Sequence, residues 1–177
     1  MSWPRRLVFV VAIALAAAGL DQASKWLMLE IVLNSPEPIA LTPFLNLRLG
    51  FNTGVSFGLF RETLEAWPGL LGLFKFAAGF GLLAWAVFAG HRLERIGLAL
   101  MAGGAFGNAI DRWRQGAVTD FLDLHWGDWH WPTFNGADIA LTLGVVLMLL
   151  AALPSRERPR AERKNRSCSR VVSARRR

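Results

Sequence analysis

Four long apolar stretches constrain this chain of 177 residues more than any other feature. They run over residues 7–29, 67–90, 96–112 and 137–153. A bilayer with a hydrocarbon core of ~30 Å is crossed by about 20 residues of helix, so each stretch can form a membrane helix. A hydrophobic content of 53%, with 8 Trp, 12 Phe and no Tyr, also favours lipid as the surrounding solvent. We therefore expect an all-α polytopic membrane protein with four transmembrane helices.

The first stretch has a second interpretation. It follows Arg5 and Arg6 and contains three alanines at residues 16–18, which is the pattern of a cleavable signal peptide. The helical pattern continues past the alanines to Leu29, so the segment is long enough to span a bilayer. We therefore favour a transmembrane helix.

Basic residues predict how the helices are oriented. Five of them lie at the same ends of the apolar stretches: Arg5, Arg6, His91, Arg92 and Arg95. Loops rich in Lys and Arg stay in the cytoplasm, so this pattern places both chain termini there. Residues 30–66 and 113–136 then face outward, where the tryptophans of the second segment can form an interfacial aromatic belt.

The C-terminal residues differ from the rest of the chain. Residues 155–177 hold ten Lys or Arg and two Glu, a net charge of +8, whereas residues 1–154 carry a net charge of −1. We interpret residues 1–154 as one membrane domain and residues 155–177 as a disordered cytoplasmic tail that can contact anionic lipids. Nucleic-acid binding is the alternative for the tail. The single cysteine, Cys168, lies there and indicates neither a disulfide nor a nucleophile.

The first outward segment contains a strand pattern. Four apolar residues alternate with polar residues or glycine, and they are Leu45, Leu47, Leu49 and Phe51. This period of two predicts a small β-sheet on the membrane surface, with its apolar side toward lipid or the helices.

Polar residues share one face of the third stretch. Gly104, Asn108 and Arg112 recur every four residues and so lie along one side of a helix. Gly103 and Gly107 form a GxxxG pair, which indicates close packing against another helix. Asp111 lies beside this face, and a local ion pair with Arg112 is its simple structural interpretation.

Two aspartates at one membrane face carry the chemical prediction. Asp120 follows the third stretch, and Asp138 begins the fourth. A charged side chain at the centre of a membrane helix costs about 2.5–3.5 kcal/mol on insertion scales, so acids near a bilayer indicate function. Two carboxyl groups that share a proton supply one acid and one base, as in aspartic proteases. Asn135 and Asp138 also have the spacing of a helix capping box, which is the structural alternative.

A metal site is a further alternative for the same segment. Its candidate ligands would be Asp120, Asp123, His125, Asp128 and His130, but their spacing matches no common metal motif. We expect His125, Asp128 and His130 to be solvated loop residues.

Two smaller polar groups remain. Asp21 and Lys25 lie one helical turn apart beside Gln22, which predicts an intrahelical salt bridge that lowers the cost of both charges near lipid. The alternative is that Lys25 approaches the catalytic or substrate region. Asn52 and Gly54 begin a turn in which a glycine allows close approach of a substrate.

Five motifs in order resemble the bacterial lipoprotein signal peptidase family, also called signal peptidase II. They are DQxSK at 21–25, NTGxSFG at 52–58, GGxxGNxxDR at 103–112, VTDF at 118–121 and FNxAD at 134–138. The resemblance covers roughly residues 5–153 and includes four helices with an outward-facing surface sheet. It does not extend to the basic tail.

The resemblance implies an inner-membrane aspartic endopeptidase that cleaves prolipoproteins immediately before a diacylglyceryl-modified cysteine. By motif match, Asp120 and Asp138 form the catalytic dyad. The residues expected to hold substrate or order the dyad are Asn52, Gly54, Asn108, Arg112 and Asn135, with support from Asp21, Lys25, Gly104 and Asp111. The active site is expected at the periplasmic face, with globomycin-type inhibitors and membrane lipids as further partners. No cofactor, metal or nucleic acid is expected, and we expect a monomer.

Two other classes of function are alternatives to a peptidase. A small transporter or proton channel would place binding groups near the bilayer midplane and often shows internal repeats, whereas here the acids lie at one edge and no repeat is visible. A scaffold subunit explains Gly103 and Gly107 but leaves Asn108, Asp120 and Asp138 without a role.

Overall fold

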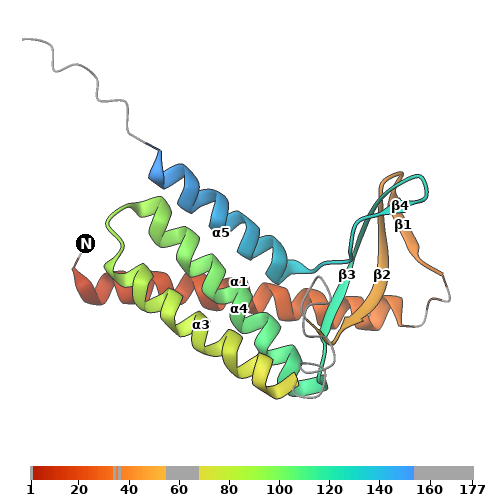
Figure 1. The fold of residues 1–177 in the computed structure, drawn as a ribbon, viewed down its shortest axis with the longest axis horizontal. Helices are drawn as coiled ribbons and strands as arrows, with labels where there is room; N and C mark the ends of the chain where they lie inside the picture. Colours follow the sequence, from red (N-terminus) through yellow and green to blue (C-terminus); the bar gives the residue numbers. More distant parts are fainter. Residues whose placement is uncertain (1, 34, 36, 55–67, 154–177) are drawn as a thin grey trace, which may run out of the picture.

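The computed structural model describes residues 2–33, 35, 37–54 and 68–153, and within these residues four helices form a bundle with a small sheet at one end (Figure 1). The helices are α1 (Trp3–Val32), α3 (Pro68–Phe88), α4 (Arg92–Gln115) and α5 (Gly136–Ala152). The strands are β1 (Ile39–Thr42), β2 (Leu45–Asn52), β3 (Val118–Trp126) and β4 (Trp129–His130). They form an antiparallel sheet in the order β1-β2-β3-β4.

Each of these helices covers most of one of the four apolar stretches. Within the described part of the chain, two helices, Trp3–Val32 and Gly69–Phe88, are long and apolar enough to cross a membrane. The helix α5 is apolar but shorter. The helix α4 carries six charged residues near its ends and packs against α1, α3 and α5, so it lies at the centre of the bundle. The tail and residues 55–67 lie outside the described residues.

Glycines bring α4 close to its neighbours. A Cβ atom on Gly103 would lie 2.6 Å from the Ala14 carbonyl oxygen of α1, and one on Gly104 would lie 2.6 Å from the Ala137 carbonyl oxygen of α5. A larger side chain at either position would force two backbones apart. The predicted role of the GxxxG pair in helix packing is therefore confirmed for Gly103, and Gly104 serves the same purpose toward α5.

A left-handed glycine connects α4 to the sheet. Gly116 has φ = 77°, and its backbone N–H donates to the Arg112 carbonyl oxygen, which ends the helix. Strand β3 begins two residues later, so Asp120 lies in a strand close to the end of α4. The residue pattern predicts strand alternation only for residues 45–51 and a loop at His125 and His130, so β3 and β4 correct that prediction. The hydrophobic and polar residues of β3 are mostly buried, which hides the period of two.

The predicted alternation along β2 is also interrupted. The register shifts between Leu47, which pairs with Leu122, and Gly50, which pairs with Asp120. Three residues of β2 thus span two of β3, and this one-residue bulge moves the following side chains to the opposite face. Phe51 is consequently 54% exposed, while Asn52 lies on the same face as Asp120.

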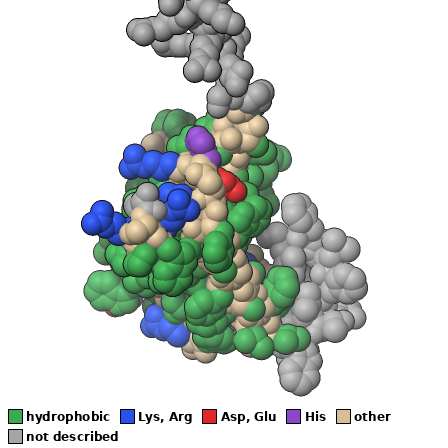
Figure 2. Space-filling model, turned by 90° about the vertical axis from the view of Figure 1, so that its left-hand side faces the viewer, with side chains coloured by type: hydrophobic (Ala, Val, Ile, Leu, Met, Phe, Trp, Pro, Cys, Tyr) green, Lys and Arg blue, Asp and Glu red, His purple; other side chains and the backbone are tan. Residues whose placement is uncertain are grey.

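The end of the bundle opposite the sheet is basic. Figure 2 views this end and shows Lys and Arg side chains among hydrophobic ones. Arg5, His91 and Arg92 are exposed there, at the start of α1 and at the junction of α3 with α4. The buried Arg95 donates to the Ala89 carbonyl oxygen at 2.8 Å and so fixes that junction.

Candidate active site

Asp120 and Asp138, which we call the dyad, come from two different elements. Asp120 is the third residue of β3, and Asp138 is the third residue of α5. Both elements start at the end of the bundle where the sheet begins (Figure 1). Asp120 is 4% exposed and Asp138 is half-buried.

Asn135 links the two aspartates directly. Its side-chain Nδ2 donates to Asp120 Oδ1 at 2.6 Å, and its Oδ1 accepts from the Asp138 backbone N–H at 3.1 Å. The Asn135 backbone N–H in turn donates to Asp138 Oδ2 at 3.2 Å, which completes a capping box. Asn135 therefore caps α5 through its Oδ1 atom and contacts Asp120 through its Nδ2 atom. The same residue serves both the structural and the catalytic interpretation of the motif.

Asn108 reaches the same place from α4. Its Nδ2 donates to Asp138 Oδ1 at 3.3 Å, and its Oδ1 accepts from Asn135 Nδ2 at 3.3 Å. The side chain is 2% exposed, so these contacts satisfy an amide that would otherwise be costly to bury.

Asn52, Gly54 and Arg112 surround Asp120 on its other side. The Asn52 side chain hydrogen-bonds to the Asp120 carboxyl group, and Asn52 Oδ1 accepts from the Gly54 backbone N–H at 3.2 Å. Arg112 Nη2 donates to the Gly54 carbonyl oxygen at 3.1 Å, and Nη1 donates to the Asn108 carbonyl oxygen at 3.5 Å. The end of β2 is thus tied to α4, with its last side chain, Asn52, directed at Asp120.

Burial changes the acidity of Asp120. Desolvation, followed by the negative charge of Asp138, raises the pKa of Asp120 from 3.8 to about 6. Hydrogen bonds from Asn135 and Asn52 and the positive charge of Lys25 act in the opposite direction. One carboxyl group of the pair therefore keeps its proton at a much higher pH than an ordinary aspartate, which lets the pair offer an acid beside a base.

The supporting residues form a buried cluster behind the dyad. The predicted salt bridge between Asp21 and Lys25 is present, with a distance of 2.8 Å. Asp111 does not form the local ion pair with Arg112 that we considered, because its Oδ2 lies 2.9 Å from Lys25 Nζ. Gln22 and Thr119 also bond to Asp111, at 2.8 and 3.1 Å, and neither was among the predicted site residues. Their positions inside the DQxSK and VTDF motifs were the available signal.

The histidines make separate contacts on the sheet. His130 Nδ1 lies 2.8 Å from Asp123 Oδ1, and the rings of His125 and His130 stack at 5.3 Å. Asp123 is 1% exposed, so this pair anchors the short strand β4 to β3. Among the described residues, no group of three or more His, Cys, Asp or Glu side chains is arranged as a metal site.

A sequence profile of the family described as signal peptidase (SPase) II matches residues 13–154 of this chain. The chain belongs to the signal peptidase II family. The match covers the sheet, every residue of the site and the bundle except the first turns of α1, and it confirms the resemblance seen in the five motifs. The protein is accordingly a peptidase of lipoprotein processing and a bacterial inner-membrane protein.

Individual relatives agree with this assignment. A lipoprotein signal peptidase of Methylorubrum extorquens is 46% identical over 148 residues, which are 83% of this chain and 85% of the relative. One of a Methylobacterium species is 42% identical, over 87% and 94% of the two chains, and one of Coxiella burnetii is 37% identical, over 86% and 91%. Two solved bacterial membrane enzymes superpose with TM-scores of 0.69 and 0.67 at 25% and 26% identity. They cover 87% and 83% of this chain and match over 93% and 94% of their own lengths.

Proposed function

We propose that this member of the signal peptidase II family is an aspartic endopeptidase with Asp120 and Asp138 as its catalytic dyad. It cleaves the signal peptide from diacylglyceryl-modified prolipoproteins immediately N-terminal to the lipidated cysteine. The observation that carries the proposal is the Asn135 side chain, which bonds to both aspartates and holds them as one unit.

The reaction follows from a dyad that holds one proton. The ionised carboxyl group takes a proton from a water molecule between the two acids, and the resulting hydroxide attacks the scissile carbonyl carbon. The protonated carboxyl group donates a hydrogen bond to the carbonyl oxygen and later helps to protonate the leaving amine. The raised pKa of Asp120, about 6, supports a dyad that keeps this proton at a higher pH than an ordinary aspartate would.

Asn52, Gly54 and Arg112 are proposed to bind the substrate backbone beside the dyad. Arg112 Nε is buried and has no hydrogen-bond partner among the described residues, so it can donate to a substrate carbonyl group. Asn108 and Asn135 order the two acids. The acyl chains of the substrate would remain in the lipid, next to the exposed apolar side chains of the bundle.

The proposed topology has four membrane-spanning helices and both termini in the cytoplasm. The basic end of the bundle supports a cytoplasmic position for that end, and the sheet and dyad at the other end would then lie at the periplasmic face (Figure 2). Cys168 tests this topology because it is the only cysteine and lies in the tail. A membrane-impermeant maleimide should label it only after the inner membrane is opened. Labelling in intact spheroplasts would contradict the orientation.

Purified protein in detergent should cleave a diacylglyceryl-modified prolipoprotein. Cleavage should be inhibited by globomycin, resist a chelator, and be lost in folded Asp120→Asn and Asp138→Asn variants. Retained cleavage in either variant would refute the dyad, and sensitivity to the chelator would indicate a metal-dependent reaction. Size-exclusion chromatography with light scattering tests the monomer that we propose as the active form.

A further inference from the structure

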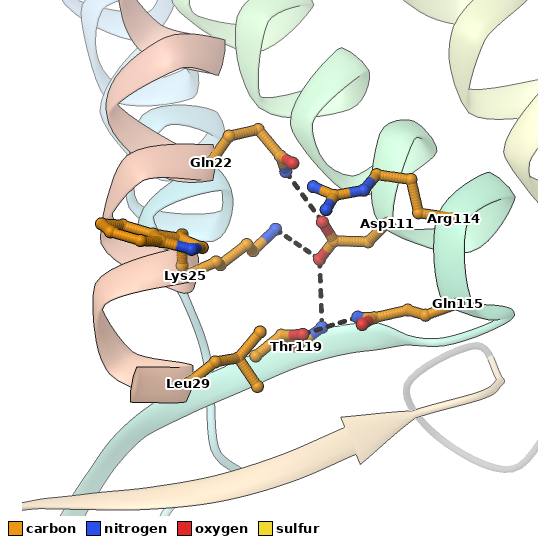
Figure 3. A pocket seen from close by; sticks show the side chains of 8 residues that line it. Gln22, Lys25, Leu29, Asp111, Arg114, Gln115 and Thr119 are labelled. Atoms are coloured by element: carbon orange, nitrogen blue, oxygen red, sulfur yellow. Dashed lines mark hydrogen bonds and ion pairs between the residues drawn. The ribbon is translucent and has the colours of Figure 1, made fainter. Parts of the chain in front are cut away.

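A buried cluster of Asp21, Lys25 and Asp111, which we call the Lys25 cluster, lies behind the dyad. These three residues are 2%, 3% and 4% exposed. Lys25 Nζ lies 2.8 Å from Asp21 Oδ2, 2.9 Å from Asp111 Oδ2 and 3.0 Å from Asn108 Oδ1. An ammonium group has three N–H donors, and each of them has one acceptor here. Figure 3 shows Lys25 pointing from α1 toward Asp111 on α4.

Each carboxylate of the cluster also holds one backbone amide. Asp21 Oδ1 accepts from the Ala137 backbone N–H at 2.7 Å, and Asp111 Oδ2 accepts from the Thr119 backbone N–H at 3.1 Å. Ala137 immediately precedes Asp138, and Thr119 immediately precedes Asp120. The two acids bonded to Lys25 therefore fix the backbone directly before each member of the dyad. Figure 3 shows the contacts of Asp111 with Lys25 and Thr119.

The hydrogen bond from Lys25 to Asn108 sets the orientation of the Asn108 side-chain amide. An ammonium group can only donate, so the atom of Asn108 that faces Lys25 must be its carbonyl oxygen. The amide nitrogen of Asn108 is then directed away from Lys25, and it donates to Asp138 Oδ1 at 3.3 Å. Without the ammonium group, only the longer hydrogen bond from Asn135 Nδ2, at 3.3 Å, would hold the Asn108 oxygen in place. The Asn108 amide that donates to Asp138 would then be held less firmly.

We propose that Lys25 is a positioning residue that aligns both aspartates of the dyad through Asp21, Asp111 and Asn108. The proposal rests on the peptidase function proposed above. An ordinary salt bridge that neutralises charge within the bundle would explain the contact between Lys25 and Asp21. It would not explain why Asp21 and Asp111 each accept from the backbone N–H of the residue directly before a dyad residue. Nor would it explain why the third N–H of Lys25 donates to Asn108.

Lys25 also influences the proton of the dyad. Its positive charge lowers the pKa of Asp120, so removal of the charge should raise that pKa further. Because the dyad works with one proton, the alkaline limb of the kcat/KM profile should then move to higher pH. A residue that only stabilises the bundle would change the amount of folded protein but not the position of this limb.

The test compares Lys25→Met with Arg95→Met. Both variants remove a buried cation from the bundle, but Arg95 bonds to the Ala89 carbonyl oxygen at the basic end. Cleavage of the lipidated substrate is measured at several pH values and expressed per folded molecule. The folded fraction comes from size-exclusion chromatography and thermal unfolding in the same detergent. Wild type and Asp120→Asn are run in parallel.

We expect Lys25→Met to lose kcat on the order of 10²-fold, the size of effect that a 1 Å misplacement of reacting groups produces. Its KM should stay within about threefold of the wild-type value, and the alkaline limb of its kcat/KM profile should move to higher pH. Folded Arg95→Met should keep the wild-type kcat and pH profile. A folded Lys25→Met variant with the wild-type kcat and limb would overturn the positioning role. A wild type that does not cleave, or an active Asp120→Asn, would instead refute the proposed function.

A double variant covers the case in which Lys25→Met does not fold. Lys25→Met combined with Asp111→Asn removes one positive and one negative charge, so the net charge of the cluster is unchanged. Met cannot donate to Asn108, so this variant should show the same loss of kcat. Wild-type kcat in the folded double variant would overturn the proposal. Failure of both variants to fold would assign Lys25 to bundle stability and would also overturn it.

Discussion

The Asp120→Asn variant should be inactive and yet more stable than the wild type at neutral pH. The reason is the pKa of Asp120, which burial and the charge of Asp138 raise from 3.8 to about 6. The folded state therefore binds this proton more tightly than the unfolded state, and the wild type loses stability as the pH rises between these two values. Asn has a similar shape and no charge to bury.

The size of the effect follows from the same pKa. One pKa unit corresponds to about 1.4 kcal/mol, so a rise from 3.8 to about 6 corresponds to about 3 kcal/mol of lost stability above pH 6. The stability difference between Asp120→Asn and wild type should be close to zero below about pH 4 and should reach its full value above about pH 6. In a chain of this size, about 3 kcal/mol moves a melting temperature by roughly 6–12 °C.

The assay is thermal unfolding in detergent at a series of pH values, and Asp111→Asn is the matched control. Asp111 is also 4% exposed, but its carboxylate pairs with Lys25 at 2.9 Å and accepts the Thr119 N–H. Neutralising a carboxylate in these charged hydrogen bonds should destabilise the protein by about 1–3 kcal/mol. Two equally buried acids should thus respond with opposite signs. A less stable Asp120→Asn at pH 7, or a stability difference that does not depend on pH, would refute the reasoning.

Three further predictions concern the dyad and the bundle. Asn135→Ser keeps a good helix cap but loses the donor to Asp120, a charged hydrogen bond worth about 1.5–3 kcal/mol, so both the melting temperature and kcat/KM should fall, the latter by roughly 10- to 150-fold if the whole loss falls on the dyad. Asn135→Ala loses the cap as well and should be less stable than Asn135→Ser by about 1 kcal/mol, so equal melting temperatures for the two variants would contradict the role of the cap. The wild-type kcat/KM should decline as the pH rises above about 6, where Asp120 loses its proton, and a flat profile from about pH 5 to about pH 8 would contradict the shared proton. Gly104→Ala should lower stability by about 1–3 kcal/mol in thermal unfolding, because its Cβ atom would lie 2.6 Å from a carbonyl oxygen of α5. Gly19→Ala is the control and should not lower stability, because a Cβ atom there would have no neighbour within 4 Å. Similar melting temperatures for the two variants would argue against close packing of α4 and α5.

Much of the site was predictable because its residues occur in short motifs. Asp120, Asp138 and Asn135 were selected from their spacing and their position next to apolar stretches, and the structure brings them together. The capping box was also predictable, since it depends on residues three positions apart. Local spacing shows which side chains share a helix face, as it did for Asn108 and Arg112, but it does not show what lies opposite that face.

The partner of Asp111 illustrates this limit. The sequence suggested the adjacent Arg112, whereas the structure pairs Asp111 with Lys25 on another helix. The strand around Asp120 was missed for a related reason, because β3 is mostly buried and loses the alternation that marks a half-exposed strand. The bulge in β2, which turns Asn52 toward Asp120, leaves no mark in the sequence that periodicity can detect.

By itself, the sequence determined the four helices, the basic end of the bundle and the identity of the polar residues. These follow from hydropathy, charge and motif order, all of which act over a few neighbouring residues. Only the tertiary structure decided how the dyad is assembled. Asp21 bonds to the amide of Ala137, 116 positions along the chain, and Lys25 bonds to Asn108, 83 positions away. Contacts at such separations depend on how closely the glycines of α4 let the helices pack, which local patterns do not encode.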